Sequence, residues 1–190
     1  MNEEMKTGAA EASIWPLALR NGLIAGLVLI ALGLILQMTG LVDPSQPQQG
    51  MSLGGVLSSL LNIVVMAGAA VMAVREYRGN TYGGFITLGK AFKLSMAVFL
   101  IISVLTVLWT LLYMGVINPD MVEIIREQAL EQASERSGGE LPEEAETMVG
   151  MFTNLRFFAI SAFFGTMLLG LLIAFFVGLV MKKEPHSPAV

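Results

Sequence analysis

The stretch from Gly84 to Lys90 combines residue types that could bind phosphate. Gly84, Gly89 and Lys90 stand at the spacing of the nucleotide-binding loop, in which backbone N–H groups and a lysine contact the phosphates of ATP. That motif also requires Ser or Thr after the lysine as a Mg²⁺ ligand, and Ala91 occupies this position. The match is therefore incomplete, and the elements around it decide its meaning.

Those elements do not suit a nucleotide site. A phosphate-binding loop joins a strand to a helix in a soluble α/β unit, whereas here one long apolar run ends at Val74 and another begins at Leu94. We therefore expect no nucleotide, no nucleic acid and no cofactor as a partner of this chain.

The composition is that of an integral membrane protein. The 190 residues are 55% hydrophobic and only 14% charged, and their mean hydropathy is +0.71. A soluble domain carries roughly 25% charged residues, so this chain has too few charges to cover a hydrated surface. The absence of cysteines excludes disulfides and thiolate metal sites.

Four apolar runs are each long enough to cross a hydrocarbon core about 30 Å thick as a helix. They are Leu17–Met38, Leu53–Val74, Leu94–Val116 and Phe157–Met181. Helices are required because lipid offers no partners for unpaired backbone groups. The first run lacks a strongly basic flank and a small-residue cleavage site, so we expect it to be retained rather than removed as a signal peptide. The sequence therefore predicts one all-α membrane domain over residues 1–190, a four-transmembrane-helix bundle.

The basic residues predict the orientation of this bundle. Eight of the eleven Lys and Arg residues would share one side with both termini and the 75–93 loop. The eight are Lys6, Arg20, Arg75, Arg78, Lys90, Lys93, Lys182 and Lys183, and the other three are Arg126, Arg136 and Arg156. Because cytoplasmic loops carry the excess of Lys and Arg, the N- and C-termini are predicted to be cytoplasmic.

Small residues predict how the spans pack. Lipid gives no hydrophobic driving force between helices, so they associate where small side chains let the backbones approach. Such residues recur on one face of the first and fourth spans. They are Gly22, Gly26 and Gly33 in the first span, and Gly170, Ala174 and Gly178 in the fourth.

A mild polar seam follows the second and third spans, formed by Asn62, Ser103, Thr106 and Thr110. These side chains either form local or interhelical hydrogen bonds, or line a path through a small oligomeric channel, transporter or lipid translocator. Coupled transport normally needs an ionisable side chain inside the membrane, and the centres of the spans supply none. We therefore favour the first interpretation.

The segment of about 118–155 is predicted to be an extracytoplasmic amphipathic helical hairpin between spans three and four. Asn118 and Pro119 would start its first helix as the cap and the first-turn residue. Glutamates recur every four residues from Glu123 to Glu135. They either lie in water at the membrane surface or form a ridge that binds a divalent cation or a basic partner. A metal site needs carboxylates that converge from several directions, so we expect no metal.

The stretch that resembles a phosphate loop is better explained as a tight turn at the membrane surface. Gly79-Asn80 and Gly83-Gly84 would let the chain turn, and Thr87 would cap the third helix. Four basic side chains gather here against one glutamate, which leaves a net charge of +3. They are Arg75, Arg78, Lys90 and Lys93. Each base beside an anionic leaflet contributes about 1 kcal/mol. These four bases either serve only to orient the protein in the membrane, which is their first expected role, or also form a specific lipid-headgroup site.

These features resemble a bacterial family. Arg78 followed by "GGFITLGKAFK", then "INPD" after the third span, an acidic hairpin and a last span ending in Lys-Lys are similar to domain of unknown function 4199. The resemblance runs from about Leu17 to Lys183 and implies a four-span inner-membrane protein, with no assigned activity or functional residues.

The expected function follows from these points. Because the spans contain no catalytic constellation, we expect a non-enzymatic accessory or scaffold protein of the bacterial inner membrane. Its expected partners are anionic lipid headgroups at the cytoplasmic face, together with a second copy or another membrane protein.

Overall fold

The structure is a computed structural model that describes residues 13–42, 52–81, 84–139 and 142–183. Lys6 and Gly83, for which the sequence predicts a cytoplasmic position and a turn, lie outside the described residues. Within them the chain is helical and forms no strand. The elements are α1 (Trp15–Met38), α2 (Leu53–Thr81), α3 (Leu88–Leu112), a π-helical turn η2 (Tyr113–Ile117), α4 (Asp120–Ser137), α5 (Glu143–Phe152) and α6 (Leu155–Met181).

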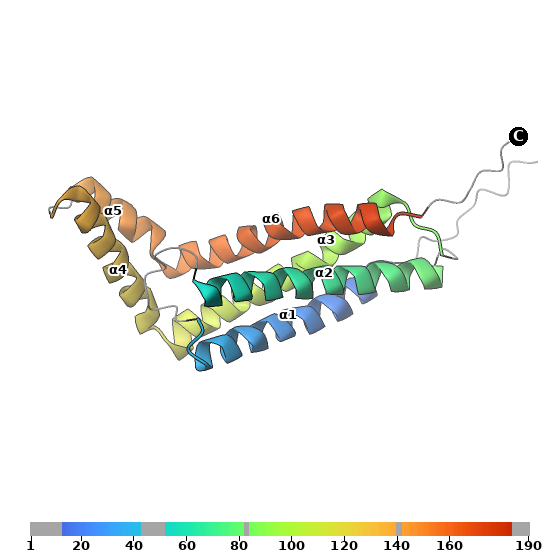
Figure 1. Cartoon of the computed structure of the whole chain (residues 1–190), viewed down its shortest axis with the longest axis horizontal. Coiled ribbons are helices and arrows are strands. Elements are labelled where there is room, and N and C mark those ends of the chain that lie inside the picture. Colours follow the sequence, from blue (N-terminus) through green and yellow to red (C-terminus); the bar gives the residue numbers. More distant parts are fainter. Residues whose placement is uncertain (1–12, 43–51, 82–83, 140–141, 184–190) are drawn as a thin grey trace, which may run out of the picture.

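The prediction of four membrane-capable helices is confirmed. α1, α2, α3 with η2, and α6 are all long enough to span a bilayer, with mean hydropathies of 2.1 to 2.5. They lie side by side in one bundle, in which α3 contacts each of the other three (Figure 1). The buried face of α3 carries Leu94, Val98, Phe99 and Ile102, each with no exposed surface. The core is therefore built around α3.

The bundle has two chemically different ends. At the first, α1 begins, α2 ends, α3 begins and α6 ends, and we call this the basic end. At the second, η2 leads into the α4–α5 hairpin, and we call this the hairpin end (Figure 1).

The connection between α2 and α3 is shorter than predicted. A turn at Gly79-Asn80 is wrong, because both residues continue α2. One glycine in an exposed last turn costs only about 1 kcal/mol, and a continuing helix keeps its backbone groups paired. The chain turns instead at Gly84, whose φ of +96° favours glycine. Thr87 caps α3 as predicted, since its side-chain oxygen accepts the N–H of Lys90 at 3.4 Å.

Small residues of α1 meet α3 only in the half of the bundle near the basic end. A Cβ at Gly22 would lie 2.7 Å from Cβ of Ile101, and a Cβ at Gly26 would lie 2.5 Å from Cδ1 of Leu105. These gaps leave no room for a larger side chain, so the two helices approach closely here. Gly33 departs from its predicted packing role, because a Cβ there would meet no atom within 4 Å.

The small residues of α6 lie on its buried face. A Cβ at Gly170 would lie 2.8 Å from two ring carbons of Phe99 on α3. Ala174 is fully buried, and a Cβ at Gly178 would lie 3.6 Å from the carbonyl oxygen of Leu88, an ordinary contact. A larger side chain at Gly170 would therefore clash with Phe99, whereas Gly178 has room for a Cβ atom.

The hairpin begins differently from the prediction. No side chain caps α4, so the predicted capping role of Asn118 is wrong. The cause is η2: the N–H of Asn118 donates to the carbonyl of Tyr113, five residues earlier, at 2.7 Å. The carbonyl of Asn118 then accepts the N–H of Met121 at 3.2 Å. α4 ends at Gly138, whose φ is +81°.

A short break separates α5 from the last long helix. Asn154 caps α6 with its side-chain oxygen, which accepts the N–H of Phe157 at 2.9 Å. On α5, Met148, Met151 and Phe152 share one exposed face, whereas the first turn is acidic. This apolar face suits a membrane surface, with the acids in water.

Candidate functional site: a basic cluster at one end of the bundle

Seven basic side chains of the described residues gather at the basic end, from α1, α2 and α3 and from the two residues that follow α6. They are Arg20, Arg75, Arg78, Lys90, Lys93, Lys182 and Lys183, and we call them the basic cluster. Arg75 and Lys93 are exposed, whereas Arg78 and Lys90 are half-buried. The four residues predicted to bind headgroups therefore stand at one end of the bundle, with three further bases.

A backbone clasp joins the loop before α3 to the end of α6. Ile86 and Lys183 exchange two backbone hydrogen bonds, each 3.0 Å long, in an isolated antiparallel bridge. The ammonium of Lys183 lies 5.8 Å from the centre of the Phe85 ring. Arg78 adds a further link, because its guanidinium donates to the carbonyl oxygen of Met181 at 3.4 Å. The clasp fixes the lysines after α6 relative to those of α3.

The phosphate-loop spacing has another structural meaning. Gly89 and Lys90 belong to the first turn of α3, and Ala91 is fully buried in the core. A helix, α2, precedes the loop where a nucleotide-binding fold has a strand. Lys90 thus extends from a helix and not from a loop that wraps around a ligand.

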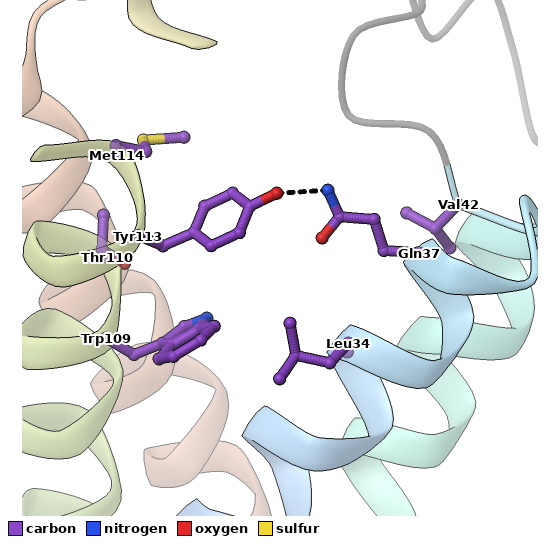
Figure 2. Close-up of a pocket in the computed structure, with 8 residues that line it drawn as sticks. Leu34, Gln37, Val42, Trp109, Thr110, Tyr113 and Met114 are labelled. Carbon is purple, nitrogen blue, oxygen red and sulfur yellow. Dashed lines mark hydrogen bonds between the residues drawn. The ribbon is translucent and has the colours of Figure 1, made fainter. Parts of the chain in front are cut away.

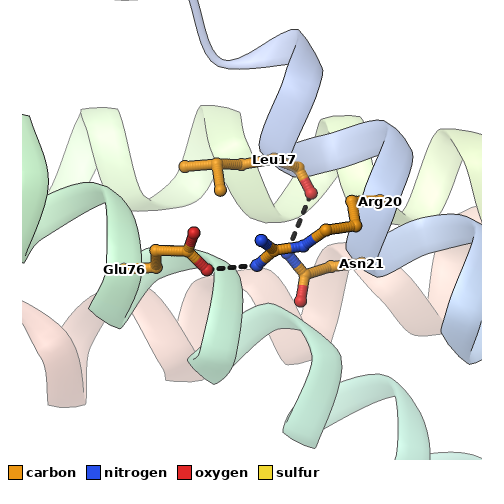
Figure 3. A network of polar contacts seen from close by, with 4 residues as sticks. All are labelled: Leu17, Arg20, Asn21 and Glu76. Atoms are coloured by element: carbon orange, nitrogen blue, oxygen red, sulfur yellow. Dashed lines mark hydrogen bonds and ion pairs between the residues drawn. The ribbon is translucent and has the colours of Figure 1, made fainter.

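An ion pair between α1 and α2 occupies the carboxylate of Glu76 at this end. Arg20 of α1 donates to the carboxylate of Glu76 on α2 (Figure 3). The sequence sets Glu76 against four predicted bases, which gives a net +3, whereas the seven bases of the basic cluster against this one acid leave +6 among the described residues at this end. The neighbouring Asn21 is buried and donates to the Leu17 carbonyl at 2.9 Å, so it serves its own helix.

The basic cluster offers hydrogen-bond donors that suit phosphate. Arginine presents a planar fork of N–H groups, and lysine presents a compact positive charge. Within the described ranges, Glu76 is the one acid at this end, and its partner already neutralises it. The exposed bases, Arg75 and Lys93, are therefore available to an external anion.

The polar seam is satisfied within its own helices. The hydroxyls of Ser103, Thr106 and Thr110 donate to carbonyl oxygens three or four residues earlier, at 2.8 to 2.9 Å. The side-chain amide of Asn62 donates to the Ser58 carbonyl at 3.0 Å. Towards the basic end, fully buried side chains of α3 close the core. The channel, transporter or translocator alternative is therefore not favoured.

The glutamate ridge of α4 faces solvent. The acids from Glu123 to Glu135 are exposed along one helix. In the part of the chain that the structure describes, no three carboxylate or histidine side chains converge on a point that could hold a metal ion. The glutamate ridge therefore gives no support to a metal site on α4.

The fold and the site together define a multi-pass helical membrane protein with one strongly basic end. The family described as protein of unknown function (DUF4199) matches residues 20–183, which is most of the chain. The protein belongs to this family, and the resemblance inferred from its residues is confirmed. No curated protein and no solved structure matches it.

Proposed function

We propose that the protein is a non-enzymatic accessory or scaffold protein of the bacterial inner membrane, whose basic cluster faces the cytoplasm and binds anionic lipid headgroups. The observation that carries this proposal is that, among the described residues, bases from α1, α2, α3 and the two positions after α6 gather around one acid, which is already paired. Membrane proteins keep their excess of Lys and Arg on the cytoplasmic side, where anionic lipids attract them.

The hairpin supports the same orientation. α4 and α5 lie at the opposite end from the basic cluster and carry acids in their first turns. In this orientation the hairpin is extracytoplasmic. The apolar face of α5 then rests on the extracytoplasmic surface of the inner membrane.

Binding and not catalysis is proposed because of the groups that the cluster contains. Its members are Lys and Arg side chains, and the described residues around them include no catalytic pair of nucleophile and base. The protein would act by holding lipids against this surface, together with a second copy or another membrane protein.

Titration of the purified full chain with phosphatidylglycerol, followed by native mass spectrometry, tests the lipid site. Replacing Arg75 and Lys93 by Gln removes two exposed bases that take no part in the clasp. At about 1 kcal/mol for each base, the apparent affinity should fall about 30-fold. Arg156→Gln, which changes an exposed base at the hairpin end, is the control and should leave the affinity unchanged.

Equal affinities of the double variant and the unaltered protein would refute the lipid site. The accessory role has its own test in purification from native membranes. A monomer that retains no lipid and brings no reproducible partner would contradict that role.

A further inference from the structure

Two adjoining cavities lie between α1 and α3 in the half of the bundle near the hairpin end. The larger has a volume of about 250 Å³ and is bordered by Gln37 and Tyr113 (Figure 2). The smaller, about 180 Å³, extends to Asn62 on α2. Gly33 and Trp109 border both, so one cavity continues from the other.

Together the cavities span the depth of about one leaflet. Gln37 is the last residue but one of α1, and Tyr113 follows α3, so the larger cavity ends at the membrane surface. Asn62 lies nine residues into α2. That distance is a rise of about 14 Å, which is close to half of the roughly 30 Å hydrocarbon core.

The lining of both cavities is uncharged and mostly apolar. Among the described residues, no Lys, Arg, Asp or Glu borders either one. The hydroxyls of Thr106 and Thr110 are used by their own helix, and the Gln37 amide donates to the Tyr113 hydroxyl across the larger cavity (Figure 2). A buried water needs two to four polar partners, which these walls do not supply along their length. Apolar cavities of roughly 150 Å³ hold benzene-sized ligands, so hydrocarbon suits both.

We infer that one acyl chain of a phospholipid from the leaflet at the hairpin end occupies these cavities, with an ester carbonyl beside Gln37 and Tyr113. Trp and Tyr side chains favour the depth at which lipid esters lie. An amide, a phenol and the indole N–H of Trp109 are donors that suit an uncharged carbonyl oxygen. The π-helical turn η2 widens the helix where Tyr113 and Met114 border the cavity, as such turns often do at binding sites. This site goes beyond the headgroup binding proposed above, because it lies at the opposite end and recognises an uncharged group.

Gly33 gives a direct way to fill the cavities. A Cβ at Gly33 would meet no atom within 4 Å, so the side chain of Gly33→Leu can enter the space without a clash at its base. Gly68 on α2 is the matched control. A Cβ there also meets no atom within 4 Å, and Gly68 borders neither cavity.

The experiment uses the full chain in vesicles of phosphatidylethanolamine and phosphatidylglycerol with a trace of phosphatidylcholine that carries a photoreactive diazirine on its acyl chain. Irradiation followed by peptide mass spectrometry maps the crosslinks. In the unaltered protein they should concentrate on Leu34 and Trp109, above the level on a lipid-exposed residue such as Phe176. Gly33→Leu should lose the crosslinks at Leu34 and Trp109, and Gly68→Leu should keep them.

An even spread of crosslinks over the exposed apolar side chains of the unaltered protein would overturn the inference, and this map needs no variant to fold. Persistence of the crosslinks at Leu34 and Trp109 in a folded Gly33→Leu protein would overturn it as well.

Discussion

Gly170 provides a quantitative test of how α6 packs on α3. A Cβ at this position would lie 2.8 Å from Cγ and Cδ2 of Phe99 and 2.9 Å from its Cβ. Carbon atoms in favourable contact are about 3.5–4.0 Å apart, so the ring or the helix must move by roughly 0.7 Å or more. Phe99 has no exposed surface, so its ring does not already lie at the outer surface of the bundle, where it could move away easily. Overpacking of this kind costs about 1–3 kcal/mol, so Gly170→Ala should lower the ratio of folded to unfolded protein by about 5- to 150-fold.

Unfolding by sodium dodecyl sulfate in mixed micelles, followed by tryptophan fluorescence, measures this cost. Gly165→Ala is the matched control, because it lies on the same helix and a Cβ there would meet no atom within 4 Å. The free energy of unfolding of the control should stay within about 0.5 kcal/mol of that of the unaltered protein. If Gly170→Ala and Gly165→Ala unfold at the same detergent fraction, the close contact between α6 and Phe99 is wrong.

Three further predictions concern polar side chains, and the same unfolding titration measures each. Thr87→Ala should cost about 1 kcal/mol because the cap of α3 is lost, whereas Thr87→Ser should be nearly neutral, and equal losses in both would argue against the cap. Thr106→Val should change the stability by less than about 0.5 kcal/mol, since the hydroxyl serves only a carbonyl of its own helix; a large loss would point to a partner on another helix. Arg20→Gln should cost at most about 1 kcal/mol, because the pair with Glu76 is partly exposed, and exchanging the two charges by Arg20→Glu with Glu76→Arg should restore most of that loss. A double exchange that is worse than the single change would show that the two side chains do not interact.

The long helices could be predicted from the sequence because the thickness of the hydrocarbon core dictates about 20 apolar residues for each span. The cap at Thr87 could be predicted as well, since capping depends on residues three positions apart. The extension of α2 through Gly79 and Asn80 could not, because glycine and asparagine permit a turn without requiring one. Local chemistry thus predicted the cap of α3 but not the end of α2, and it predicted the wrong cap for α4 at Asn118.

Contacts between distant positions account for most of what the sequence did not reveal. The basic residues near the α2–α3 loop could be named, but the bridge between Ile86 and Lys183 has no local signal. The pairing of Arg20 with Glu76 joins residues 56 positions apart, and no periodicity links them. Gly33 is an example within one helix of a contact that the sequence could not predict. It shares a face with glycines that touch α3, yet the relative course of the two helices leaves open space beside it.

The side of the membrane on which the basic cluster lies is the central claim, and cysteine labelling measures it most directly. The chain contains no cysteine, so a single Asn80→Cys reports on the basic end and a single Glu135→Cys reports on the hairpin, both at exposed positions. In intact spheroplasts, a membrane-impermeant maleimide should label Glu135→Cys at once and Asn80→Cys only after permeabilisation. Labelling of Asn80→Cys in intact spheroplasts, with Glu135→Cys protected, would contradict the account.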